Sequence, residues 1–423
     1  MKVFFDTVGC RLNQAEIEHL AGEFRSAGHV IVDSADGADL VVLNTCAVTA
    51  GAASDSRQKV RQAQHAGAKS IVVTGCLATL DPGESANLPG VSLVVPNAEK
   101  DQIPGLVLGQ IDIFDLEPLA RHPLPGARKR TRAFIKVQDG CDNLCTFCVT
   151  RIARGSAESV PKEAVLQQVI AATTGGAREV VLTGVHLGCW GRDLREGENL
   201  VNLVAYLLDK APVERLRLSS TEPWDLDERF FDLWQDSRMC RHLHLPLQSG
   251  SAGVLRRMAR RTTPEEYRAL LKHARSRIPG LAVTTDIIVG FPGETDEEYN
   301  ESLEFVKEME FSGGHVFRYS ARPGTAAARF PGRVHGSVAK ERARMMRSVL
   351  DETEQRYAQG FIGANLKALW ETAESKDNNW LLRGLTDNYI QVTALAKTDR
   401  SNHIDTVRIE SIDGNILSAA NIT

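Results

Sequence analysis

Short runs of apolar residues alternate with helix-like stretches along the first hundred residues of the chain. The apolar runs are rich in β-branched residues and lie at Lys2–Val8, Asp39–Leu43 and Ser70–Val73. Strands that alternate with helical segments are typical of a parallel sheet with crossover helices. The pattern therefore predicts an open parallel α/β domain over residues 1–120.

The same alternation continues over residues 133–338, where the period of apolar positions switches between strand and helix. Six strands are predicted there, at Phe134–Gln138, Glu179–Leu182, Arg215–Leu218, His242–Leu245, Val283–Ile288 and His315–Tyr319. Helical segments such as Pro161–Thr173 and Asp296–Met309 separate them. Six such units predict a partial (β/α)6 barrel, in which functional groups usually occupy the loops that follow the strands.

The pattern changes again after residue 338. Residues 339–360 are predicted to form an amphipathic, arginine-rich connecting helix. Residues 361–423 contain short β-rich runs with turns, which is typical of a small antiparallel β-barrel. This segment has eight Asp or Glu against six Lys or Arg, unlike a general basic RNA-binding module. Its Trp370, Trp380 and Tyr389 either stack on bases or, as we expect, fill the small core.

A chain of 423 residues is long enough for two or three domains. No apolar run is long enough to span a bilayer, and the first residues lack the apolar core and cleavage site of a signal peptide. We therefore expect a cytoplasmic protein with no membrane contact, whose eight cysteines are thiols or metal ligands. The net charge of −4 means that any contact with nucleic acid depends on local patches.

One such patch is the segment 121–132, between the first two predicted domains. It has five Lys or Arg and no acidic residue, and its Pro and Gly residues interrupt regular structure. The segment is either a solvated basic linker or a contact with an RNA backbone.

Three cysteines follow the first strand of the predicted barrel. Cys141, Cys145 and Cys148 have three residues and then two residues between them. A compact loop with this spacing suits three thiolates around one 4Fe–4S cluster, which normally has four cysteine ligands. The fourth iron is then left open for chemistry. Structural zinc needs four ligands and a disulfide would leave one cysteine over, so the spacing favours a cluster.

A second group of cysteines is spread over the first domain. Cys10, Cys46 and Cys76 each follow one of the predicted strands. The carboxyl ends of parallel strands meet at one edge of a sheet, so these three residues are expected to converge. Small buried cysteines are the alternative, but three equivalent strand ends favour a second cluster with an open iron. Cys189 and Cys240 lack partners at ligand spacing and are interpreted as packing residues.

Two glycine-containing turns follow barrel strands and are candidates for cofactor binding. Thr183, Gly184 and Val185 follow the second strand, while Ile288 and Gly290 end the fifth. Glycine permits a cofactor to approach the backbone closely, although ordinary strand-to-helix turns also use it.

Other side chains near these loops leave their roles open. Phe147 lies beside the third cysteine of the loop and either contacts the cofactor or packs in the core. His242 and His244 alternate on one strand and so face the same side, as barrel-lining or core residues. The run from Arg256 to Arg261 contains four arginines, of which one is expected to reach an anion.

With these motifs the chain resembles the radical S-adenosylmethionine (SAM) methylthiotransferases over nearly its whole length. The matching runs are Gly9-Cys10-Arg11-Leu12-Asn13-Gln14, Asn44-Thr45-Cys46-Ala47-Val48-Thr49, Thr74-Gly75-Cys76, the central cysteine loop with Arg154-Gly155, and Leu245-Pro246-Leu247-Gln248-Ser249-Gly250-Ser251. The last domain resembles a TRAM domain. The residues after Cys10, and the Thr-Gly-Val-His-Leu-Gly turn that begins at Thr183, resemble the branch acting on N6-threonylcarbamoyladenosine at position 37 of tRNA.

This resemblance implies two 4Fe–4S clusters and two roles for SAM, as radical source and as methyl donor. The cluster on Cys141, Cys145 and Cys148 would bind SAM and cleave it reductively. The cluster on Cys10, Cys46 and Cys76 would hold the sulfur that becomes a methylthio group at C2 of the adenine. The implied partners are the tRNA anticodon loop, an electron donor such as flavodoxin or ferredoxin, and a sulfur source.

Other functions are also consistent with these motifs. The substrate could be tRNA with isopentenyladenosine at position 37, or an aspartate of a ribosomal protein. An N-terminal cluster that only relays electrons would make a different kind of radical SAM enzyme. An iron–sulfur protein that binds or senses RNA without turnover is the non-enzymatic alternative.

Overall fold

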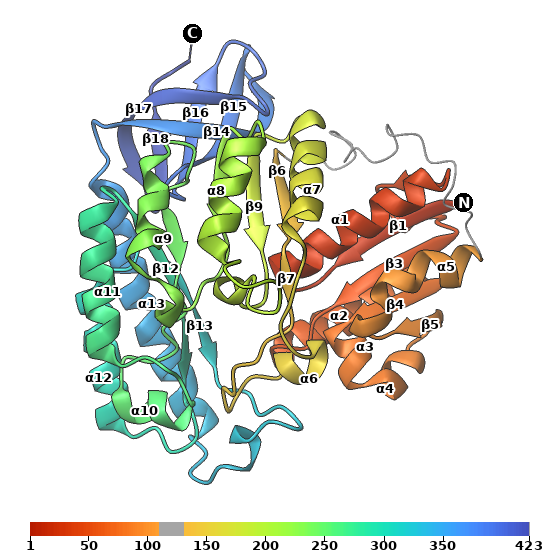
Figure 1. The fold of residues 1–423 in the computed structure, drawn as a ribbon, viewed down its shortest axis with the longest axis horizontal. Coiled ribbons are helices and arrows are strands. Elements are labelled where there is room, and N and C mark those ends of the chain that lie inside the picture. Colours follow the sequence, from red (N-terminus) through yellow and green to blue (C-terminus); the bar gives the residue numbers. More distant parts are fainter. Residues whose placement is uncertain (110–130, 423) are drawn as a thin grey trace.

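A computed structural model describes residues 1–109 and 131–422 of the chain. Residues 121–130 of the expected basic linker lie outside the described residues. Figure 1 shows an N-terminal α/β unit beside a central barrel, and a small C-terminal β-barrel that covers one end of the central one. The structure is therefore of the mixed α/β class that the sequence predicts.

The N-terminal unit is built on one parallel sheet. Its strands are β1 (Lys2–Thr7), β2 (Val30–Val32), β3 (Leu40–Thr45), β4 (Ile71–Gly75) and β5 (Val91–Val95), in the order β2-β1-β3-β4-β5. Its helices are α1 (Arg11–Ser26), α2 (Ala50–His65), α3 (Cys76–Leu80), α4 (Pro82–Ala86) and α5 (Ile103–Leu108), with a 3₁₀ turn at Asn97–Gln102. Every residue of β3 and β4 is buried, as expected for central parallel strands with a hydrophobic core on each face.

The central barrel has two parallel sheets. One has the order β10-β9-β6 and the other β11-β12-β13, and isolated bridges from Leu216 and Ser220 connect them. Its strands are β6 (Arg132–Lys136), β9 (Glu179–Thr183), β10 (Arg215–Leu218), β11 (His242–His244), β12 (Ala282–Val289) and β13 (Gly314–Arg318); β7 (Gln138–Asp139) and β8 (Glu158–Ser159) form a small separate ribbon. All six predicted barrel strands are present within two residues of their expected ends.

Helices surround this barrel and cover its outer face (Figure 1). They are α6 (Thr150–Arg154), α7 (Lys162–Thr174), α8 (Leu200–Lys210), α9 (Glu228–Asp232), α10 (Ala252–Arg257), α11 (Pro264–Arg277), α12 (Asp296–Met309) and α13 (Gly336–Gln359). The helix α13, expected as a connection, packs Ala343, Met346 and Leu350 into the barrel's hydrophobic core. It is therefore part of the barrel's packing as well as the route to the last domain.

The C-terminal unit is a closed barrel of β14 (Asn365–Lys376), β15 (Asn379–Thr386), β16 (Gln391–Ala396), β17 (Ile404–Asp413) and β18 (Ile416–Ala419). Its strands pair antiparallel except for β16 and β18, which run parallel. Trp370 is fully buried in its core, as expected. The side chain of Tyr389 instead lies outside this core and stacks on the ring of His242, with 4.1 Å between the ring centroids.

Arginines from the barrel strands hold the C-terminal barrel in place. Arg217 is fully buried, and its guanidinium binds both carboxylate oxygens of Glu179 and the carbonyl of Thr386. Burial would raise the pKa of Glu179, but Arg217 and Arg215 outweigh it and hold the pKa at about 2.

Within the residues that the structure describes, no helix has the length and apolar character to cross a membrane.

Candidate functional site

The N-terminal triad, defined as Cys10, Cys46 and Cys76, lies at one edge of the first sheet. Cys10 precedes α1, Cys46 directly follows β3, and Cys76 begins α3 directly after β4. Because β1, β3 and β4 are neighbours in the sheet, their carboxyl ends bring the three cysteines to one place. Cys46 and Cys76 are buried and Cys10 is exposed.

Glycines allow the turns of this triad to pass close to one another. Gly9 has a φ of +105°, and a Cβ at Gly9 would lie 2.7 Å from the sulfur of Cys46. Gly75 has a φ of +100°, and a Cβ there would lie 2.3 Å from the carbonyl oxygen of Thr45. Only glycine fits both the backbone conformation and the contact, so these two positions fix how closely the strand ends approach.

Burial makes the thiolate form of Cys46 unfavourable. Burial, together with the neighbouring thiols of Cys10 and Cys76, raises the pKa of Cys46 to about 11 against the opposing effect of Arg154. Metal ligation needs the thiolate. A positive charge near these cysteines would therefore favour the thiolate form that metal ligation needs.

That charge comes from the central barrel. The buried Arg154 donates to Asn13 at 2.6 Å and to a carboxylate oxygen of Glu16 at 2.9 Å. Asn13 and Glu16 belong to α1, close behind Cys10, while Asp139 of the barrel also binds Arg154 at 2.9 Å.

Lys100 completes this buried ion network. Its Nζ lies 2.5 Å from Glu16, and both side chains are 3% exposed. Burial would raise the pKa of Glu16, but Lys100 and Arg154 outweigh it and hold the pKa well below its usual value. The network therefore joins the N-terminal unit to the barrel directly beside Cys10.

The barrel triad, defined as Cys141, Cys145 and Cys148, lies in one loop between β7 and α6. All three residues are partly exposed. The loop is held by the amide of Thr146, which donates to Met258 at 3.0 Å, and by the Thr146 hydroxyl, which donates to Arg257 at 2.8 Å. The segment after β11 therefore fixes the loop from the other side of the barrel.

Two basic side chains approach this triad. Arg260 lies with Nη1 3.9 Å from the sulfur of Cys145, and it also pairs with Glu222 at 2.6 Å. Burial raises the pKa of Cys145 to about 11, and the charge of Arg260 opposes this effect. Of the four arginines in the predicted run, Arg260 is thus the one that reaches the cysteine loop.

His186 is the second basic group, and sequence analysis did not assign it a role. Its Nδ1 lies 4.0 Å from the sulfur of Cys141, and its Nε2 lies 2.5 Å from the buried Asp225. Burial lowers the pKa of His186, but the hydrogen bond with Asp225 and the contact with Cys141 outweigh it and raise the pKa to about 12. His186 directly follows the turn Thr183-Gly184-Val185, so its place after a barrel strand was the available signal.

The structure gives several of the predicted cofactor residues packing neighbours. A Cβ at Gly184 would lie 2.9 Å from the Gln138 side chain, and one at Gly290 would lie 2.8 Å from Cβ of Ala339. Gly290 also has a φ of +73°. Phe147 packs against the small hydrophobic cluster of Val254, Met258, Phe291 and Ala327, together with Ile288. Thr183 is buried at the end of β9, while Val185 is partly exposed.

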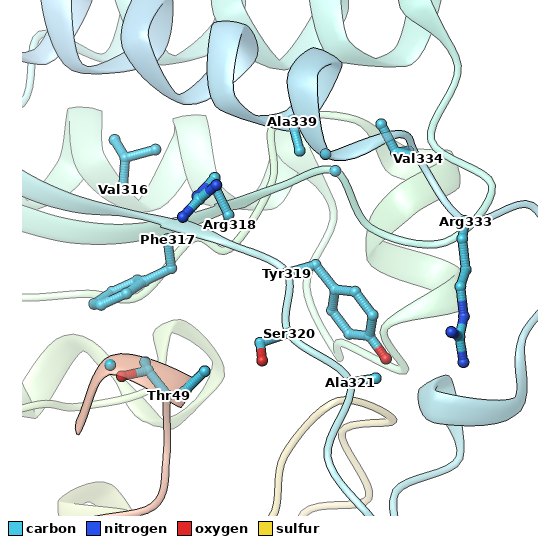
Figure 2. A pocket seen from close by; sticks show the side chains of 14 residues that line it. Thr49, Val316, Phe317, Arg318, Tyr319, Ser320, Ala321, Arg333, Val334 and Ala339 are labelled. Carbon is cyan, nitrogen blue, oxygen red and sulfur yellow. The ribbon is translucent and has the colours of Figure 1, made fainter. Parts of the chain in front are cut away.

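A pocket of about 530 Å³ opens between the two units (Figure 2). One wall is formed by Thr49, Ala50 and Gly51, which begin α2 just after Cys46, and another by β13 with the residues that follow it. Phe317, Tyr319, Arg318 and Arg333 project around it, and Gly290 contributes backbone. The pocket therefore combines aromatic and cationic side chains beside the loop of Cys46.

No three His, Cys, Asp or Glu side chains within residues 1–109 and 131–422 lie close enough together to hold one metal ion. Cys189 and Cys240 are buried, and the sulfur of Cys240 lies 3.7 Å from a carboxylate oxygen of Glu179. His242 and His244 both bond to Thr284 at 2.9 Å.

Comparisons with known proteins match two parts of the chain to separate families. Residues 2–96 match the uncharacterized protein family UPF0004, and residues 135–306 match the Radical SAM superfamily. These two ranges contain the N-terminal triad and the barrel triad, respectively.

Relatives match the chain over its whole length. The threonylcarbamoyladenosine tRNA methylthiotransferase MtaB of Bacillus subtilis is 36% identical over 96% of this chain and 93% of its own length. The protein of the same name from Thermotoga maritima is 35% identical over 97% of this chain and 94% of its own. The chain belongs to the MtaB methylthiotransferase family.

More distant matches agree with this family assignment. A tRNA-2-methylthio-N(6)-dimethylallyladenosine synthase of Caldicellulosiruptor saccharolyticus is 32% identical over 90% of this chain and 84% of its own length. Among solved structures, the radical SAM methyltransferase TsrM of Kitasatospora setae aligns with a TM-score of 0.57 over 89% of this chain and 79% of its own. Its sequence identity of 15% supports the fold alone. As a radical SAM protein of the MtaB family, the chain uses SAM and a 4Fe–4S cluster.

Proposed function

We propose that this protein adds a methylthio group to C2 of N6-threonylcarbamoyladenosine at position 37 of tRNA, beside the anticodon. It would do so with two 4Fe–4S clusters, one on each cysteine triad, and with SAM bound near Thr183, Gly184, Val185, Ile288 and Gly290. An electron donor such as flavodoxin or ferredoxin and a source of sulfur complete the expected partners. The family relatives carry the substrate assignment.

The observation that carries the two-site arrangement is the contact between α6 and the N-terminal edge. The helix α6 begins two residues after Cys148, and its last residue is Arg154, which binds Asn13 and Glu16 beside Cys10. Asn97 donates to the carbonyl of Ala153 at 2.8 Å and lies 3.8 Å from the sulfur of Cys76. One short element thus connects both triads.

The donor set fits a cluster at each triad. Three thiols converge at each place, and each group has an arginine near it that favours the thiolate form. When bound, an iron–sulfur cluster with an open iron and SAM supply the radical chemistry, which belongs to the cofactors.

The residues of the chain then position these groups and the substrate. Arg260 directs an N–H group toward Cys145 and His186 places Nδ1 beside Cys141, and polar groups around the cysteine ligands adjust the electron affinity of a cluster. The adenine at position 37 is unpaired in the anticodon loop, so it can enter a site between the units without melting of a duplex.

The direct test offers the anaerobically reconstituted protein two tRNAs, one with threonylcarbamoyladenosine and one with isopentenyladenosine at position 37. SAM and a reductant are added, and the digested nucleosides are analysed by mass spectrometry. We expect a methylthio product on the first tRNA alone. Product on the second tRNA alone would contradict the substrate assignment, and SAM cleavage without any RNA product would point to a protein substrate.

A further inference from the structure

Arg322 lies between the barrel and the N-terminal triad. Arg322 lies in the segment that follows β13. The residue before it, Ala321, lines the pocket of Figure 2. The backbone carbonyl of Arg322 accepts hydrogen bonds from the amide and the hydroxyl of Thr325, at 3.2 and 2.8 Å. The backbone at Arg322 is thus fixed by a turn, and the half-buried side chain extends toward Cys46 and Arg57 of the other unit.

The guanidinium of Arg322 has two donors without acceptors. Its Nε and Nη2 atoms are both buried and have no hydrogen-bond partner, and no described residue forms an ion pair with it. Buried donors in native proteins are nearly always paired, and an unpaired one is costly. The neighbouring Arg57 is itself paired with Glu84 at 3.3 Å.

The unpaired edge has the geometry of an anion site. The Nε–H and Nη2–H groups of an arginine point in the same direction and grip two oxygens at once. Arg217 holds Glu179 through these two atoms at 2.7 and 3.1 Å, and Arg241 holds Asp387 in the same way at 2.6 and 3.0 Å. The same edge of Arg322, formed by Nε and Nη2, has no acceptor among the described residues.

Its surroundings indicate which kind of anion would arrive. The adjacent pocket is lined by Arg318 and Arg333 and by the aromatic side chains of Phe317 and Tyr319. Cationic and aromatic side chains together suit the phosphates and bases of single-stranded RNA. The 49–51 wall of the pocket follows Cys46, so an occupant would lie beside the N-terminal triad.

We propose that Arg322 binds a two-oxygen anion of the substrate RNA beside the N-terminal triad, and that the pocket with Arg318 and Arg333 holds the adjoining nucleotide. This inference rests on the proposed function. The anion has two possible sources on that substrate, the carboxylate of the threonylcarbamoyl group or a backbone phosphate of the anticodon loop. The two share their oxygen geometry and differ in whether the modification must be present.

The test measures the affinity of the reconstituted holoprotein for an anticodon stem-loop RNA by fluorescence anisotropy, without turnover. Two RNAs are compared, one with threonylcarbamoyladenosine and one with plain adenosine at position 37. The proteins are the wild type, Arg322→Gln, Arg322→Lys and the control Arg268→Gln. Arg268 is partly exposed on α11, pairs with Glu308 and does not line the pocket, so its loss removes one arginine charge at another place.

For Arg322→Gln we expect binding of the modified RNA to weaken about tenfold or more, because charge-assisted bidentate contacts are strong. Arg322→Lys should recover only part of this loss, since it keeps the charge without the fork. A loss confined to the modified RNA identifies the carboxylate, and an equal loss on both RNAs identifies a phosphate. Iron content equal to that of the wild type shows that each variant has kept its fold and clusters.

Unchanged affinity for both RNAs would overturn the inference. The inference also fails if Arg322→Gln alters the electron paramagnetic resonance spectrum of the N-terminal cluster while RNA affinity stays constant, because Arg322 would then serve the cluster. A wild type that binds neither RNA would overturn the proposed function first. Normal methylthiolation by the wild type, with no effect of Arg322→Gln on binding, would overturn this inference alone.

Discussion

The two cysteine triads are built in opposite ways. Cys141, Cys145 and Cys148 lie within eight residues of one loop, and the barrel that carries them also supplies Arg260 and His186. The cysteines of the N-terminal triad lie at three different strand ends, and Cys10 and Cys76 are 66 residues apart in sequence. The cations near this triad, Arg154 and Arg322, come from the other unit.

This difference indicates that the N-terminal triad depends on assembly of the whole molecule. A local loop can hold its ligands together as soon as its own barrel folds. The N-terminal edge gains its compensating charge only when α6 and the residues after β13 pack against it. Cluster formation at that edge is therefore expected to depend on contacts between the units.

The largest expected effect separates the roles of the triads. In Cys145→Ala, cleavage of SAM should stop because one ligand of the barrel cluster is lost. In Cys46→Ala, 5′-deoxyadenosine should still form while the methylthio nucleoside disappears. Both products are measured by mass spectrometry, with the buried Cys240→Ala as a control that should retain both. Methylthio product from Cys46→Ala would remove the distinction between the sites.

The next effect concerns the ion network between the units. Arg154→Met removes the closer of the cations that contact both Glu16 and Asp139 and leaves only the longer contacts of Lys136 as a shared partner, which should cost about 3 kcal/mol of stability. The N-terminal cluster should be lost preferentially, while the barrel cluster remains. Urea denaturation and iron analysis measure the two effects. Equal loss of iron from both sites would contradict the dependence on the interface.

A smaller effect is expected at the barrel triad. Arg260→Gln removes the N–H group near Cys145 but keeps the cysteine ligands, so SAM cleavage should fall about tenfold. The reduction potential of the barrel cluster should shift while that of the N-terminal cluster stays constant. Redox titration followed by electron paramagnetic resonance separates the two. A shift in the N-terminal signal would show that Arg260 acts on both sites.

The mildest test of the comparison uses pH. The pKa of Glu16 is held below its usual value, so its contribution to stability is complete above the unfolded pKa of about 4.3. This contribution is lost as the pH falls through the lower folded value. Urea midpoints of the cluster-free protein should therefore fall more steeply on acidification in the wild type than in Glu16→Gln. Parallel curves would indicate that the network contributes nothing in this range.

Much of the fold could be predicted from the sequence because its apolar periodicity is strong. The barrel strands follow the expected positions, and the two cysteine triads were predicted from spacing in one case and from places after strands in the other. The loops after parallel strands share one edge, so the pattern of residues alone places Cys10, Cys46 and Cys76 in the same region.

The contacts between distant segments could not be predicted in this way. Arg154, Glu16 and Lys100 are ordinary charged residues in the sequence, and their joint burial depends on how two units pack. Gly184 and Gly290 were assigned to cofactor binding, but their neighbours Gln138 and Ala339 also require glycine. Arg322 carries no sequence signal, because its buried donors without a partner among the described residues are apparent only once the chain is folded.

The most direct measurement of the central claim is the iron and sulfide content of the anaerobically reconstituted chain. The wild type should contain about eight iron atoms per chain, and Cys46→Ala and Cys145→Ala should each contain about four. Mössbauer spectra should show 4Fe–4S clusters in all three proteins. About four iron atoms in the wild type, unchanged in Cys46→Ala, would contradict the claim that the N-terminal triad holds a second cluster.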